Sequence, residues 1–212
     1  MLNVVVLISG GGSNLKALLE AAADPAYPAR IVAVGADTDA AGLAHAEAAG
    51  VPSFIVRPGD HGSREEWGRA FASAIREHLP RGSENSEGPG DPEGAAGSDE
   101  GLVVSAGLMR ILPADFVREF SPRLINTHPA LLPLYPGAHA VRDALAAGAT
   151  ETGVTVHVID EGVDTGPVLR QARVEIIPGE PEEELHERIK QLERPLLVQT
   201  VRDIALGELS LR

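Results

Sequence analysis

The sequence contains no cysteine. This absence excludes disulfide bridges, thiolate metal sites and cysteine nucleophiles. Aromatic residues make up only 3% of the chain, so its core must be built mainly from Val, Leu, Ile and Ala. Such an interior is typical of an aliphatic sheet-and-helix protein, and it offers no aromatic platform on which RNA bases could stack.

Positive charge is also scarce, and the formal net charge is -13. This excess of negative charge argues against nucleic acids and anionic membranes as partners. No apolar run is long enough to span a bilayer, and no basic segment precedes the apolar run at residues 4–8. We therefore expect a soluble, cytoplasmic protein that does not bind membranes.

The chain has 212 residues, which is enough for one sizeable α/β domain. Strand-like apolar runs alternate with helix-periodic segments along its length. This alternation predicts a single doubly wound, mostly parallel sheet with helices on both faces, a Rossmann-like arrangement. Ligands of such sheets bind at the carboxyl ends of the strands.

The expected elements can be placed along the chain from periodicity and turn residues. We expect strands at residues 3–9, 31–36, 53–56, 102–106, 123–127, 153–159 and 168–176. We expect helices capped by Ser13 or Asn14, at residues 40–49, 63–79, 113–120 and 137–147, and after Pro181. Residues 80–101 are rich in Gly, Ser, Pro and acidic side chains, which predicts a flexible acidic insertion.

Asn126 and His128 lie at the end of the expected strand 123–127. Pro129 keeps the preceding backbone extended, and residues two apart in an extended chain point to the same side. We therefore expect the Asn126 amide and the His128 imidazole to project together. The alternative is that neighbouring backbone satisfies Asn126 and that His128 is structural.

The loop at residues 160–167 follows another apolar run and supplies the carboxylate that this pair lacks. Its acids are Asp160, Glu161 and Asp164, and its glycines permit tight turns. An amide donor, an imidazole and a carboxylate at neighbouring strand ends fit acyl transfer without a covalent nucleophile. The alternative for each acid is a solvated loop position.

A metal site formed by His128, His139, His157 and Asp164 is a further alternative. The spacing of these residues matches no recognisable ligand pattern. We therefore expect no metal.

Residues 9–14 read Ser-Gly-Gly-Gly-Ser-Asn and join the first expected strand to the first helix. The amides at a helix N-terminus favour a bound phosphate. A dinucleotide fingerprint would require a small residue in place of Leu15, and a P-loop would require a lysine that is absent here. A plain tight turn is the remaining alternative.

With these motifs in place, the chain resembles the phosphoribosylglycinamide formyltransferases, folate-dependent enzymes of purine synthesis. The resemblance is carried by four motifs in the same order, at residues 10–15, 106–112, 126–133 and 153–157 with 164–167. It covers nearly the whole chain except residues 80–100. It implies 10-formyltetrahydrofolate as co-substrate, glycinamide ribonucleotide as acceptor, and a monomer or homodimer that acts on small molecules.

The resemblance also implies roles for individual residues. The catalytic trio would be Asn126, His128 and Asp164. The ribonucleotide and its phosphate would be held by Gly12, Ser13, Asn14, Arg64, Lys190 and Glu193. The folate pocket would comprise Met109, Arg110, Ile111, Leu112, Val117, Leu124, Asp160, Glu161, Gly162 and Val163. Leu134 stands where a basic residue often follows Leu-Leu-Pro, so no folate-tail contact is expected there.

Several other functions are alternatives. Methionyl-tRNA formyltransferases and formyltetrahydrofolate hydrolases share the Asn-x-His and Asp elements, but each would carry an additional domain that we do not expect in 212 residues. A dinucleotide-dependent dehydrogenase is disfavoured by Leu15. A phosphate-binding module without catalytic activity would bind the ribonucleotide and form no product.

Overall fold

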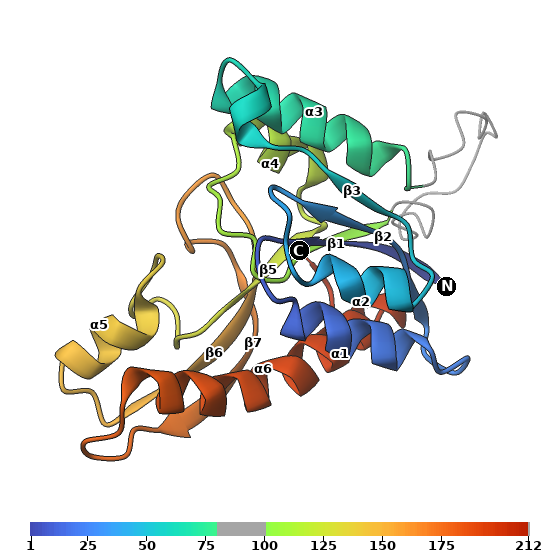
Figure 1. The fold of residues 1–212 in the computed structure, drawn as a ribbon. Coiled ribbons are helices and arrows are strands. Elements are labelled where there is room, and N and C mark those ends of the chain that lie inside the picture. Colours follow the sequence, from blue (N-terminus) through green and yellow to red (C-terminus); the bar gives the residue numbers. More distant parts are fainter. Residues whose placement is uncertain (80–100, 212) are drawn as a thin grey trace, which may run out of the picture.

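The structure is a computed structural model that describes residues 1–79 and 101–211. The predicted insertion falls almost entirely on residues 80–100, which lie outside the described residues. Seven strands form one sheet in the order β3-β2-β1-β4-β5-β6-β7 (Figure 1). The strands are β1 (Leu2–Ile8), β2 (Ala29–Ala36), β3 (Ser53–Ile55), β4 (Leu102–Ser105), β5 (Leu124–His128), β6 (Glu151–Val158) and β7 (Val168–Glu175).

Helices connect most of these strands. They are α1 (Ser13–Ala22), α2 (Leu43–Ala48), the 3-10 helix η1 (Pro58–Asp60), α3 (Arg64–Arg76), α4 (Ala114–Phe120), α5 (Ala140–Ala146) and α6 (Glu182–Ala205). The strands from β1 to β5 pair in parallel, whereas β6 and β7 pair antiparallel. The predicted mostly parallel α/β sheet is therefore confirmed. Within the described residues, no helix combines the length and apolar character needed to cross a membrane.

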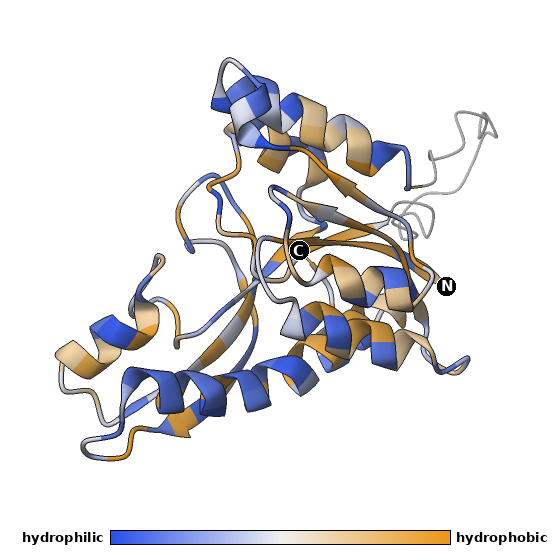
Figure 2. Cartoon of the chain, viewed as in Figure 1, coloured by the Kyte–Doolittle hydropathy of each residue, from blue (hydrophilic) through white to orange (hydrophobic). Residues whose placement is uncertain are grey.

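The helices cover both faces of the sheet, as the doubly wound prediction requires (Figure 1). On β1, Val4, Val6 and Ile8 pack into a core with α1, α2 and α6. The alternating residues Val5 and Leu7 pack into a second core with α3 and α4. This two-sided burial explains why the strand is apolar at successive positions, and Figure 2 shows the hydrophobic colour concentrated along the central strands.

The start of α1 differs from the prediction. Gly12 occupies the N-cap position with φ 69°, and neither Ser13 nor Asn14 caps the helix. This left-handed backbone conformation suits glycine, which has no Cβ to clash. The predicted cap of α3 is confirmed, because the Ser63 hydroxyl accepts a hydrogen bond from the Glu66 amide at 3.1 Å.

Gly153 allows β6 to pack closely against β7. A Cβ atom at this position would lie 2.0 Å from the Ala172 carbonyl oxygen and 2.7 Å from Leu131 Cδ2. Leu131 belongs to the segment that follows β5, so this contact also bears on the loop beside the candidate site.

We expect Gly153→Ala to lower the free energy of unfolding by about 2 kcal/mol or more, because overpacking against fixed backbone is costly. Gly59→Ala is the matched control, since a Cβ there would meet nothing within 4 Å. Urea unfolding of both variants checks this expectation through the transition midpoint. A midpoint for Gly153→Ala equal to that of Gly59→Ala would contradict it.

Candidate functional site

Three of the predicted motifs meet at the carboxyl edge of the sheet. The strands β1, β4 and β5 are neighbours and run in parallel, so the segments that follow them emerge on the same side. The Ser9 amide donates to the Gly107 carbonyl at 3.0 Å, and the Met109 amide donates to the Ser9 hydroxyl at 2.8 Å. The glycine turn is therefore joined directly to the segment after β4.

Asn126 and His128 are held by the pairing of β5 with β6. In this antiparallel register Asn126 lies opposite His157, and His128 lies opposite Thr155. Directly opposed residues share one face of a sheet, as do residues two apart on one strand. The Asn126 amide nitrogen Nδ2 consequently lies 3.2 Å from His157 Nε2.

Asp164 reaches this pair from the loop after β6. Its Oδ2 atom lies 3.4 Å from His128 Nδ1, and its Oδ1 atom lies 3.5 Å from His157 Nε2. The backbone amide of Gly137 donates to Oδ2 at 2.7 Å. The structure thus brings the predicted trio together, with His157 between Asn126 and Asp164. The backbone of Asp164 is left-handed, with φ 54°.

The surroundings of Asp164 stabilise its ionised form. The neighbouring His157 imidazole is the largest cause of a lowered pKa, and the Gly137 amide and positive charge on the imidazoles act in the same direction. Burial opposes these effects, yet the pKa of Asp164 still falls to about 2. Because an unfolded Asp titrates at about 3.9, ionised Asp164 stabilises the fold above about pH 4, and this contribution is lost as the pH falls toward 2.

His128 is held by the segment that follows it. Its Nε2 atom lies 2.8 Å from the Tyr135 carbonyl oxygen, which can only accept, so this nitrogen carries a proton. The second nitrogen, Nδ1, faces the ionised Asp164. A proton on Nδ1 would turn that contact into an attraction between the imidazole and the carboxylate.

Thr155 on β6 anchors the segment that follows β5. Its hydroxyl donates to the Ala130 carbonyl at 2.7 Å and accepts from the Leu132 amide at 3.0 Å. Gln171 on β7 adds a hydrogen bond to the Leu132 carbonyl at 2.9 Å. These contacts fix the backbone that supplies the Tyr135 carbonyl and the Gly137 amide to the site.

Most of the predicted ribonucleotide residues lie on the face covered by α1 and α6. Gly12, Ser13 and Asn14 begin α1, and α1 contacts α6, which carries Lys190 and Glu193. Asn14 is buried, and its Oδ1 atom has no hydrogen-bond partner among the described residues. This unsatisfied side chain lies where the free amides of the helix N-terminus also need partners.

The two α6 residues of this group already have partners of their own. Glu193 is buried and accepts a hydrogen bond from the Thr127 hydroxyl at 2.8 Å. Lys190 Nζ lies 2.6 Å from Glu187 Oε1. The buried Glu193 therefore connects α6 to β5 beside the candidate catalytic trio.

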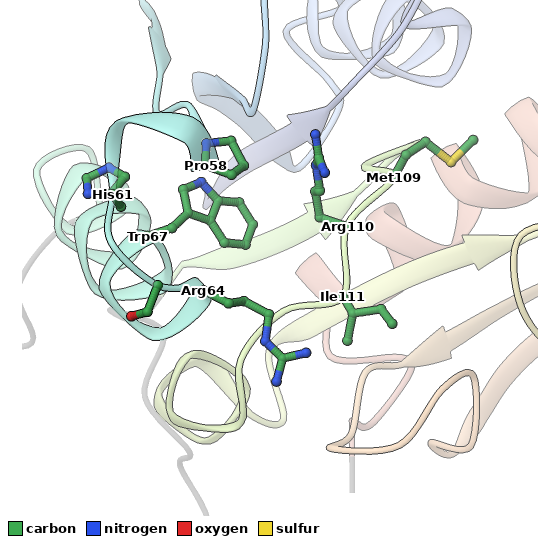
Figure 3. Close-up of a pocket in the computed structure, with 8 residues that line it drawn as sticks. Pro58, His61, Arg64, Trp67, Met109, Arg110 and Ile111 are labelled. Carbon is green, nitrogen blue, oxygen red and sulfur yellow. The ribbon is translucent and has the colours of Figure 1, made fainter.

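Arg64 lies apart from this group. It begins α3 on the other face of the sheet and lines a pocket of about 520 Å³ with Met109, Arg110 and Ile111. Figure 3 shows its side chain extending toward the segment that carries Ile111. The structure therefore groups Arg64 with predicted folate residues. Arg110 is steadied by an ion pair of 2.6 Å from its Nε to Oδ2 of the buried Asp37.

The remaining predicted folate residues fall into two groups. Val117 and Leu124 are buried in the core that the sheet shares with α3 and α4, and Leu112 packs against that core. In the second group, Asp160 braces its own loop by accepting from the Gly162 amide and the Thr165 hydroxyl. The other members are Glu161, which binds Arg118 at 2.9 Å, and Val163, which is exposed.

Sequence reasoning named His157 only as a possible metal ligand and did not predict its place beside Asn126. It belonged to one of the four motifs and alternated with Thr155, but only the position of β6 beside β5 reveals its contact with Asn126. The backbone contributions of Tyr135 and Gly137 had no sequence signal. Within the described ranges 1–79 and 101–211, no group of three or more His, Asp or Glu residues is arranged to hold a metal ion.

Comparison with known proteins agrees with this geometry. The family described as formyl transferase matches residues 2–81 and 92–201. A phosphoribosylglycinamide formyltransferase of Mycobacterium tuberculosis is 48% identical over 202 residues, which cover 95% of this chain and 84% of the relative.

Solved structures show the same relationship. The glycinamide ribonucleotide transformylase 1 of Symbiobacterium toebii superposes with a TM-score of 0.85 and 34% identity, covering 98% of this chain and 89% of that one. The phosphoribosylglycinamide formyltransferase of Brucella melitensis gives a TM-score of 0.80 and 37% identity, with coverages of 96% and 95%. The chain therefore belongs to the formyl transferase family, and within it to the phosphoribosylglycinamide formyltransferases.

Proposed function

We propose that this protein transfers the formyl group of 10-formyltetrahydrofolate to the amine of glycinamide ribonucleotide, a step of purine biosynthesis. The observation that carries the proposal is the convergence of Asn126, His128 and Asp164 around His157 at the sheet edge. Family membership supports the same reaction. The two substrates would bind at this edge from the two opposite faces of the sheet.

The acceptor would bind on the side of α1 and α6. The free amides at Gly12, Ser13 and Asn14 would receive its phosphate, because the N-terminus of a helix carries partial positive charge. Glu193 would receive the glycinamide part near Thr127. Lys190 would add a positive charge to the same side.

The folate would bind on the side of the 520 Å³ pocket. Met109 and Ile111 are exposed apolar side chains on which an aromatic ring system could rest. Arg64 and Arg110 would supply positive charge to the acidic end of the co-substrate. Asp160, Glu161 and Val163 belong to the loop that would close over the pterin.

The reaction itself needs no covalent enzyme intermediate. The amine attacks the formyl carbon, negative charge develops on the formyl oxygen, and the bond from that carbon to N10 then breaks. Asn126 would donate a hydrogen bond to the developing oxyanion in the partly dehydrated cleft. Both N–H groups of protonated His128 are directed at Tyr135 and Asp164, so His128 would stabilise the oxyanion mainly through its positive charge.

Proton transfer completes the reaction. The attacking nitrogen loses a proton and N10 gains one, so no net acid or base is consumed. Asp164 would favour the charged form of His128 and would help to relay this proton, through a water molecule where direct contact is lacking. Since the pKa of Asp164 is about 2, its carboxylate stays ionised throughout the neutral pH range.

A paired assay tests the proposed function. Purified protein is given 10-formyltetrahydrofolate with and without glycinamide ribonucleotide, and deformylated folate and formylated ribonucleotide are measured. We expect both products in equal amounts, and only when the ribonucleotide is present. Deformylation that does not need the ribonucleotide would instead support a hydrolase, and binding without product would support a phosphate-binding module.

We expect Asn126→Ala to lower kcat by about 10² to 10³, the usual cost of losing one oxyanion donor. We expect Asp164→Asn to lower kcat by about 10² or more, the usual cost of losing a group that assists proton transfer. Asparagine tolerates the left-handed backbone at position 164, so Asp164→Asn should keep the fold. Steady-state kinetics with circular dichroism check both points. Asp143→Asn, an exposed acid on α5, is the matched control, and near-normal kcat in either site variant would contradict the assignment.

A further inference from the structure

Glu193 is an acid at a position where the pattern of α6 calls for an apolar residue. The buried face of this helix repeats every four residues, and its other members at this spacing are Leu185, Ile189, Leu197 and Val201. Glu193 is only 7% exposed. A buried acid costs free energy unless hydrogen bonds satisfy it, and an apolar side chain would avoid that cost. Such a break in a local pattern is expected at a functional site.

The Thr127 hydroxyl is the one hydrogen-bond partner of the Glu193 side chain among the described residues. It donates to Oε1 at 2.8 Å. Lys190 lies three residues away on the same helix, but its Nζ atom pairs with Glu187. A carboxylate accepts at both oxygens, so Glu193 Oε2 has unused capacity. Oε2 does not belong to the fully buried polar atoms that lack a partner, so it still reaches solvent.

Thr127 lies between the two candidate catalytic residues of β5 but faces the other way. Successive residues of a strand point to opposite faces, so Asn126 and His128 face Asp164 while Thr127 faces α6. The Thr127 side chain is itself buried. One short stretch of backbone therefore fixes the Glu193 carboxylate relative to the Asn126 amide.

We propose that Thr127 is a positioning residue for the acceptor: its hydroxyl occupies Oε1 of Glu193 and leaves Oε2 for an N–H group of glycinamide ribonucleotide. This inference rests on the proposed function, which places the acceptor on the side of α1 and α6. The hydrogen bond gives the carboxylate one orientation before the substrate arrives. Without the hydroxyl, the Glu193 side chain rotates more freely, and the substrate must order it on binding.

The substitution Thr127→Val tests this role, because it removes the hydroxyl and keeps the branched shape. We expect KM for the ribonucleotide to rise by about tenfold or more, the effect of losing one hydrogen bond to a charged group. KM for 10-formyltetrahydrofolate should change by less than about threefold, since the folate residues lie on the other face of the sheet. An unchanged ribonucleotide KM, or equal increases in both KM values, would overturn the proposal.

Thr127→Ser supplies the rescue, because serine keeps the donor. Its ribonucleotide KM should lie within about threefold of the wild-type value, and a KM as high as that of Thr127→Val would count against the proposal. Thr152→Val is the matched control. Thr152 is also buried on a strand, but its hydroxyl has no hydrogen-bond partner among the described residues. Both KM values of this control should equal those of the wild type.

A double-mutant cycle shows whether Thr127 acts through Glu193. In the Glu193→Ala background, Thr127→Val should change kcat/KM for the ribonucleotide by less than about twofold, because the carboxylate that the hydroxyl orients is gone. A loss as large as in the wild-type background would overturn the proposal, since Thr127 would then act independently of Glu193.

Calorimetric titration of the protein with glycinamide ribonucleotide alone separates this inference from the proposed reaction. We expect the wild type to bind, and Thr127→Val to bind about tenfold or more weakly. A wild type that binds the ribonucleotide but forms no product would refute the proposed reaction, while the ratio of the two dissociation constants still decides the role of Thr127. A wild type that does not bind the ribonucleotide would overturn both.

Discussion

The carboxylate of Asp164 joins parts of the chain that are far apart in sequence. It contacts His128 at the end of β5, His157 on β6 and the Gly137 amide in the segment between them. These contacts lower its pKa to about 2, so a fixed negative charge lies at the centre of the site. That charge lies within reach of two imidazoles. In the proposed reaction, a positively charged imidazole would stabilise the formyl oxygen as it becomes an anion.

The change from parallel to antiparallel pairing at β5 makes this arrangement possible. Parallel strands would bring only their carboxyl ends to the site, whereas the antiparallel β6 runs back alongside β5 and pairs with its last residues. His157 and Thr155 thereby lie opposite Asn126 and His128. One of these partners contacts a candidate catalytic side chain, and the other anchors the segment that carries Tyr135 and Gly137.

Local patterns in the sequence predicted most of the elements because each depends on nearby residues. The apolar run of β1, the Ser63 cap and the alternation around Asn126 and His128 needed no knowledge of distant contacts. Features that depend on strand order could not be read in this way. The contact between His157 and Asn126 requires β6 to lie beside β5. The grouping of Arg64 with the predicted folate residues requires α3 to cover the opposite face from α1.

The most direct test of this electrostatic arrangement is the titration of Asp164 itself. Carbon-13 NMR of carboxyl-labelled protein, with Asp164→Asn to assign the signal, follows its ionisation from pH 7 downward. The structure predicts that the signal keeps its ionised position through pH 4 and approaches its midpoint only near pH 2. A midpoint near 4, the ordinary value for an aspartate, would contradict the account, because the carboxylate would then gain nothing from the two imidazoles and the Gly137 amide.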